Sequence, residues 1–131
     1  MLIKSERHIL FYVFVLMPMS AVGFDANEKF LQCCLNSGLN NCTKLCQYPP
    51  PFITPDVYGC VLPRFTQWIV CYTGGKDNRE CCQENGVTAE FENCLDLCNG
   101  VNALYLPSLK YAKCPLVSDA IAKCNYDGNS A

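Results

Sequence analysis

The sequence predicts an all-α fold, a small disulfide-rich domain of about six short helices that form two repeated halves. Two observations lead to this prediction. All twelve cysteines follow residue 23, and they fall into two sets of six with closely matched spacing. The segments between them are rich in helix formers and end at glycine or proline, which is typical of short helices.

The N-terminal segment, residues 1–23, has the features of a signal peptide. Positively charged residues come first, an apolar run covers residues 9–17, and small residues precede the expected cleavage after residue 23. A membrane anchor is the alternative, but Pro18 interrupts a run shorter than the ~20 residues that a spanning helix needs. We therefore expect a secreted, extracellular protein whose mature chain, residues 24–131, does not insert into a membrane.

The composition of the mature chain bounds its function. It has 108 residues, with 8 basic and 11 acidic side chains. This small negative charge argues against nucleic-acid binding and against a cationic membrane-lytic peptide. Cysteine makes up about 11% of these residues, above the ~8–10% that marks a disulfide scaffold. An even number in an exported chain predicts six disulfides and no free thiol.

The cysteine pattern is a duplication. Both halves, about residues 27–75 and 77–128, contain C-C-x-x-x-G and then N-C-x-x-L-C, followed by two single cysteines. Repeated units rarely bury their apolar faces alone, so we expect both halves to belong to one domain over residues 24–131. The predicted disulfide cysteines are Cys33, Cys34, Cys42, Cys46, Cys60, Cys71, Cys81, Cys82, Cys94, Cys98, Cys114 and Cys124.

Three helices are expected in the first half. Residues 28–38 contain good helix formers and end at a glycine. The next helix would place Cys42 and Cys46 on one face, and the prolines at 49–51 would stop it. The third follows Pro63, a residue suited to a first helical turn. Its apolar stripe consists of Phe65, Trp68, Ile69 and Tyr72.

The second half repeats this order. Its first helix is expected to begin at Asp77, with Glu80 three residues later as in a capping box, and to end at Gly86. The next helix is expected to begin near Thr88 and to stop at Gly100. The third follows a proline, and its apolar stripe consists of Val117, Ile121 and Cys124.

The adjacent cysteines restrict the disulfide pairing. Neighbouring positions on a helix point about 100° apart, so the two members of each adjacent pair are expected to bond to different partners. A helical hairpin would let one or both reach the C-x-x-x-C cysteines. Cys60 and Cys71 would then bond to each other or cross to the other half, and spacing alone leaves this choice open.

The array C-C-x-x-x-G-L ahead of N-C-x-x-L-C, repeated after D-x-x-x-C-C at residues 77–82, resembles the DB module. That family occurs in secreted and cell-surface proteins of roundworms, sometimes beside immunoglobulin or fibronectin-type domains. The resemblance covers about residues 30–126, with one departure at Asn78, where the family often has histidine. The family has no established activity, so the resemblance implies the cysteine framework and leaves the function open.

Few residues suggest catalysis. The only histidine, His8, lies in the predicted signal peptide, which argues against Ser-His and Cys-His catalysis and removes the commonest zinc ligand. No C-x-x-C redox motif occurs, and we expect no cofactor and no metal. The pairs Glu80 with Glu84 and Glu92 with Asp96 have i,i+4 spacing, and they would support acid–base chemistry or calcium binding only in a buried cleft. We interpret them as a solvated face.

Two long connections are the expected contact surface. Residues 47–59 combine four prolines with aromatic side chains, and their counterpart, residues 99–113, holds leucines and tyrosines. Rigid loops with aromatic residues make low-entropy contact surfaces. The alternative is that these side chains fold back over a thin core. The candidate binding residues are Tyr48, Phe52, Ile53, Tyr58, Tyr105 and Leu106.

Asn41 begins an Asn-Cys-Thr sequon and is a candidate glycosylation site. The intervening cysteine, which is expected to form a disulfide, is a less favourable context for the modification.

We therefore predict a secreted interaction module that binds an extracellular or cell-surface protein and is not an enzyme. The alternatives are a matrix- or cuticle-associated structural protein and a histidine-free, carboxylate-based hydrolase. An exposed apolar patch over Phe52, Ile53 and Tyr105 would favour the binding module. A cleft that gathers the paired carboxylates would favour the hydrolase.

Overall fold

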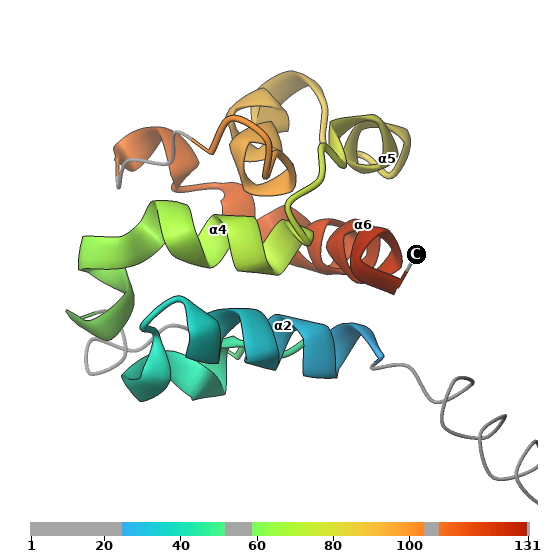
Figure 1. Cartoon of the computed structure of the whole chain (residues 1–131). Coiled ribbons are helices and arrows are strands. Elements are labelled where there is room, and N and C mark those ends of the chain that lie inside the picture. The colour runs from blue at the N-terminus through green and yellow to red at the C-terminus, as the bar shows by residue number, and fades with distance from the viewer. Residues whose placement is uncertain (1–24, 52–58, 104–107, 131) are drawn as a thin grey trace, which may run out of the picture.

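The structure, a computed structural model, describes residues 25–51, 59–103 and 108–130, and it confirms the all-α prediction (Figure 1). The first half contains α2 (Ala26–Asn36), the 3-10 helix η1 (Asn40–Leu45), and η2 (Leu62–Arg64), which continues into α4 (Phe65–Thr73). The second half contains α5 (Arg79–Glu84), η3 (Ala89–Cys98), η4 (Leu109–Tyr111), and η5 (Cys114–Val117), which continues into α6 (Ser118–Ser130).

The helices form three layers, with α4 and α6 side by side in the middle (Figure 1). The helices α2 and η1 lie on one side of this pair, and α5 and η3 lie on the other. The last helix, α6, contacts α2 and α4 of the first half as well as α5 of its own half. The two halves therefore share one core, and the C-terminal helix completes it.

The helix ends follow local sequence signals, with one correction. The Asp25 carboxylate caps α2 by accepting a hydrogen bond from the Glu28 backbone N–H at 2.9 Å. Gly74 ends α4 in the left-handed conformation at φ 70°. The capping box expected at Asp77 is wrong, because α5 begins at Arg79 and the Asp77 carboxylate bonds to Arg79 instead.

The second helix of each half is a 3-10 helix and not the α-helix that we expected. In η1 the backbone kinks at Cys42, where φ is −114°. The two cysteines of each C-x-x-x-C motif bond to different partners on different elements. Because a 3-10 helix has three residues per turn, positions i and i+4 do not share one face, and the expected α-helical face with both sulfurs is not formed.

Six disulfides join all twelve cysteines, three in each half and in the same order. Adjacent cysteines bond to different partners, as predicted. Cys60 and Cys71 neither pair with each other nor cross to the second half. The bonds of the first half are Cys33–Cys71, Cys34–Cys46 and Cys42–Cys60, and their counterparts are Cys81–Cys124, Cys82–Cys98 and Cys94–Cys114.

An aromatic cluster fills the core of the first half. Phe30, which is fully buried, lies 4.8 Å from Tyr48 and 5.6 Å from Tyr72 between ring centroids. Trp68 stacks on Tyr72 at 4.7 Å, and its indole N–H donates to the Leu45 carbonyl at 3.2 Å. Such ring contacts stabilise a core beyond the area that they bury.

Candidate functional site

A charged groove of about 630 Å³ lies along α5 and η3. Asp77, just before α5, lines it together with Arg79 and Glu80 of α5, and Glu92 and Asp96 line it from η3. Lys110, on η4, completes the lining with a second positive charge. The groove therefore combines four carboxylates with two positive charges, and its walls are mainly polar.

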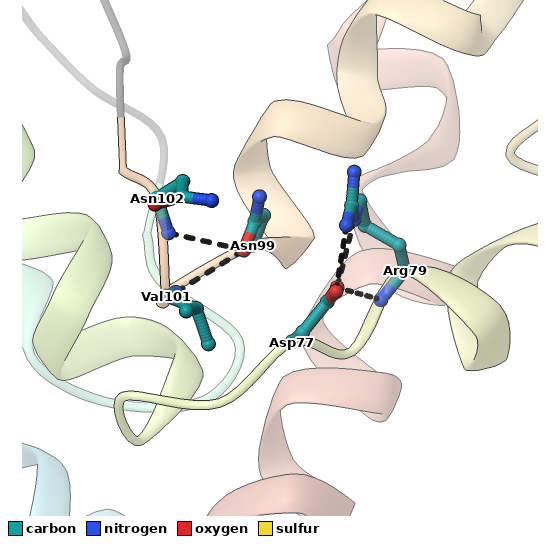
Figure 2. Close-up of polar contacts among 5 residues, drawn as sticks. All are labelled: Asp77, Arg79, Asn99, Val101 and Asn102. Atoms are coloured by element: carbon teal, nitrogen blue, oxygen red, sulfur yellow. Dashed lines mark hydrogen bonds and ion pairs between the residues drawn. The ribbon is translucent and has the colours of Figure 1, made fainter.

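Backbone pairing at the junction of the second half places Asp77 in this groove. The Asn78 N–H donates to the Cys98 carbonyl at 2.7 Å, and the Gly100 N–H donates to the Lys76 carbonyl at 2.8 Å. These bonds flank an isolated antiparallel bridge between Asp77 and Asn99. The Asn99 side chain caps the turn that follows, because its Oδ1 accepts from the Val101 and Asn102 backbone N–H groups (Figure 2).

Arg79 holds the Asp77 carboxylate with a two-pronged contact (Figure 2). Its Nε lies 2.8 Å from Oδ1, and its Nη2 lies 2.7 Å from Oδ2. These charged hydrogen bonds lower the pKa of Asp77 and raise that of Arg79. Both side chains stay open to water, with 38% of the Asp77 side chain and 50% of the Arg79 side chain exposed.

The opposite wall carries a second set of polar contacts. The Asp96 carboxylate accepts a hydrogen bond from the Tyr111 hydroxyl and lies 3.6 Å from the Lys110 ammonium. Asp96 and Lys110 keep 44% and 49% of their side chains exposed. Solvent therefore reaches this pair as well, and its attraction is weakened by water.

Three of the four carboxylates that the sequence singled out line the same groove. Glu80, Glu92 and Asp96 line the charged groove, whereas Glu84 is not part of its lining. Glu80 and Glu92 are exposed, and Asp96 is half-exposed. Among the described residues, no group of three or more histidine, cysteine or acidic side chains is arranged to hold a metal ion.

A smaller groove of about 310 Å³, the apolar groove, lies between α6 and the segment after η1. Tyr48 and Pro49 form one side, and Ala122 and Tyr126 form the other. Asp119 and Lys123, also on α6, add one charge of each sign to its lining. The Tyr48 and Tyr126 rings meet edge to face, with their centroids 5.5 Å apart.

The core holds Tyr48 in place. Its hydroxyl donates to the Tyr72 carbonyl and accepts from the Asn129 side-chain amide at 3.0 Å. Burial raises the pKa of Tyr48 to about 12, although the hydrogen bond with Asn129 acts in the opposite direction. One edge of the ring therefore packs in the core while another part lines the apolar groove.

Of the six predicted contact residues, Tyr48 is the one that the structure describes. Phe52, Ile53, Tyr58, Tyr105 and Leu106 lie outside the described residues. Sequence reasoning missed Ala122 and Tyr126, which face Tyr48 from the other half. The available signal was the single aromatic residue two positions after the last cysteine, where the first half has Thr73.

Within the described part of the chain, none of the helices has the length and apolarity needed to cross a membrane.

The DB module is the family whose sequence pattern matches the chain, over residues 33–125. This match covers more than half of the chain and includes all twelve cysteines, from Cys33 to Cys124. The chain therefore belongs to the DB module family. No curated protein and no solved structure matches it.

Proposed function

From its membership of the DB module family, we propose that the chain is a secreted interaction module that binds an extracellular or cell-surface protein. The apolar groove is its contact surface. The observation that carries this proposal is that Tyr48, chosen from sequence as a contact residue, lines the groove beside Tyr126.

The composition of the apolar groove suits protein recognition. Interfaces commonly combine an apolar centre rich in aromatic residues with a polar rim. Tyr48, Pro49 and Tyr126 supply the centre, and Asp119 and Lys123 supply the rim. Tyrosine is also enriched among the residues that carry most of the binding energy in interfaces.

Rigidity lowers the cost of binding at this surface. The Tyr48 ring is ordered by contacts with Phe30, Tyr72 and Tyr126 before any partner arrives. Little side-chain entropy is then lost on binding, so more of the contact energy appears as affinity. The disulfide Cys34–Cys46 further restrains the chain just ahead of Tyr48.

Secretion is part of the proposal and is supported by two independent features. Residues 1–23 have the sequence features of a signal peptide. All twelve cysteines are in disulfides, which persist in oxidising compartments. Cleavage after residue 23 would leave residues 24–131 as one domain of two disulfide-bonded halves.

The hydrolase remains the second candidate because the charged groove gathers Glu80, Glu92 and Asp96. The geometry favours recognition over catalysis. Burial commonly prepares a carboxyl group for general acid–base catalysis near neutral pH, whereas these three side chains are exposed or half-exposed. The DB module family also has no established enzymatic activity.

The test is partner capture from an extracellular extract by the protein secreted from cells that express the whole chain, with bound proteins identified by mass spectrometry. We expect the double variant Lys123→Glu with Tyr126→Ala to lose a partner that the wild type captures. Leu116→Ala is the matched control, because Leu116 is 78% exposed and is not part of the apolar groove. Equal capture by both variants, with both folded, would contradict the proposed surface.

A third variant separates the hydrolase from the binding module. Glu80→Gln with Glu92→Gln removes two charges from the charged groove and leaves the apolar groove intact. We expect it to retain the partner. If the wild-type protein hydrolyses a component of the extract and this variant does not, the result would instead support the hydrolase.

A further inference from the structure

We propose that Asn41, in the first half of the domain, carries an N-linked glycan and that the second half carries none. The proposal depends on the proposed secretion, because N-linked glycans are added to chains that enter the secretory pathway. Asn41, Cys42 and Thr43 form the N-x-[ST] sequence that this modification requires.

The 3-10 helix η1 presents the sequon in a suitable way. Asn41 and Lys44 are exposed, whereas Cys42 and Leu45 are buried. The folded domain therefore accommodates a glycan on Asn41 without disturbing the cysteine in the middle of the sequon.

The disulfide of Cys42 is compatible with the modification. Its partner, Cys60, is 18 residues further along the chain, so the complete sequon emerges during synthesis before this bond can close. In the transfer step, the Asn41 amide nitrogen forms a bond to the anomeric carbon of a lipid-diphosphate-linked oligosaccharide. The nitrogen gives up one proton, and the lipid diphosphate leaves with the electrons of the broken carbon–oxygen bond.

The duplication supplies an internal comparison. Asn93 occupies the position in the second half that Asn41 occupies in the first, because each directly precedes the first cysteine of N-C-x-x-L-C. Asn93 is exposed and lines the charged groove. Leu95 stands where the first half has Thr43, so the hydroxyl that completes the sequon is missing. A glycan on Asn41 would cover the first-half counterpart of this surface, while the charged groove stays open.

The experiment is secretion of the full chain from a eukaryotic cell, followed by mass spectrometry with and without peptide N-glycosidase. We expect the secreted wild type to lose the mass of one oligosaccharide on treatment and to have aspartate at position 41. Thr43→Ala and Asn41→Gln should be secreted without this change, and Thr43→Ser should retain it. Secreted wild type that carries no glycan would overturn the proposal.

A gain-of-site variant tests the comparison between the halves. In Asn41→Gln with Leu95→Thr, we expect one glycan at Asn93. The matched control adds Asn93→Gln to these changes, which keeps the altered packing at position 95 and removes the acceptor. If Asn93 of the secreted variant carries no glycan, the missing hydroxyl at position 95 is not the feature that distinguishes the two halves.

Failure of secretion is distinguishable from failure of glycosylation. If the wild type stays inside the cell, the proposed secretion is wrong, and the full chain is then expressed behind the signal peptide of an established secreted protein. A glycan at Asn41 under this condition supports the acceptor site by itself. Secreted protein without a glycan rejects it.

Discussion

The two halves of the domain have the same disulfide pattern and different interiors. Positions can be matched by their distance from equivalent cysteines. Aromatic residues of the first half then correspond to polar or smaller residues of the second. The matched pairs are Phe30 with Asn78, Tyr48 with Gly100, Trp68 with Ile121, and Tyr72 with Asn125.

Hydrogen bonds occupy the place of the aromatic cluster in the second half. The Asn78 amide donates to the Asn125 side-chain oxygen at 3.0 Å and to the Thr73 carbonyl at 3.1 Å. The Asn125 amide, fully buried, donates to the Leu97 carbonyl at 3.1 Å. The two halves thus share one disulfide pattern, but the interior of the first half is aromatic and that of the second half is hydrogen-bonded. Only the aromatic interior extends to a groove lined by tyrosines.

The largest expected effect comes from removing the centre of the aromatic cluster. Phe30→Ala should lower the free energy of unfolding by about 3–5 kcal/mol, because the ring is fully buried and its removal leaves a cavity. The matched change Asn78→Ala should cost about 1–3 kcal/mol, the range for unpaired buried hydrogen-bonding groups. Denaturant unfolding with the disulfides intact measures both, and equal losses would contradict the comparison.

Gly100→Ala should have the next largest effect. Gly100 corresponds to Tyr48, and a β-carbon at this position would clash with the Thr73 hydroxyl oxygen. Overpacking of this kind costs about 1–3 kcal/mol. Gly59→Ala is the control, because a β-carbon there meets no atom within 4 Å. Thermal unfolding of both variants tests the difference, and an unchanged midpoint for Gly100→Ala would disprove the close contact.

Much of the fold was predictable because it depends on local pattern and on counting. The duplicated cysteine spacing indicated two similar halves, and twelve cysteines in a chain expected to be secreted indicated six disulfides. The disulfide pairing was not predictable from spacing. Cys71 reaches Cys33, and Cys124 reaches Cys81, only because helices far apart in the sequence pack together. The 3-10 form of η1 and η3 was likewise not indicated by the local sequence pattern, which fits an α-helix equally well.

The site was predictable only in part, for the same reason. Tyr48 lies in a proline-rich connection that has the composition of a contact loop. Tyr126 lies on α6 of the other half, and its contact with Tyr48 arises from packing of α6 against the first half. The groove between them is therefore a long-range feature, which periodicity within either segment does not indicate.

Alkaline pH should destabilise the aromatic half through its tyrosines. The pKa of Tyr48 is about 12 in the folded protein, against about 10 for an unfolded chain. Folding therefore favours the neutral phenol, and this contribution is complete below pH ~10 and is lost as the pH rises toward 12. Burial also raises the pKa of Tyr72, whereas its counterpart Asn125 does not titrate.

Tyr48→Phe removes the hydroxyl that titrates and so isolates the contribution of Tyr48 to the pH dependence of stability. At neutral pH it should cost about 0.5–1.5 kcal/mol, because the hydroxyl contacts with Tyr72 and Asn129 are lost. Above pH ~10 its stability should fall less steeply than that of the wild type. Unfolding measured at several pH values checks both statements, and parallel alkaline curves would show that Tyr48 does not contribute.

The smallest expected effect is that of Asp77→Asn in the second half, where the matched position of the first half is Lys29. Arg79 lowers the pKa of Asp77, so the contribution of this ion pair is present above pH ~4, the usual range for aspartate, and is lost as the pH falls through the lower folded value. Because both side chains are open to water, we expect no resolvable change in unfolding at neutral pH. The junction is instead held by the backbone bonds from Asn78 to Cys98 and from Gly100 to Lys76. A clear loss of stability in Asp77→Asn, reduced by added salt, would show that the second half depends on this exposed ion pair and not on its hydrogen-bonded interior.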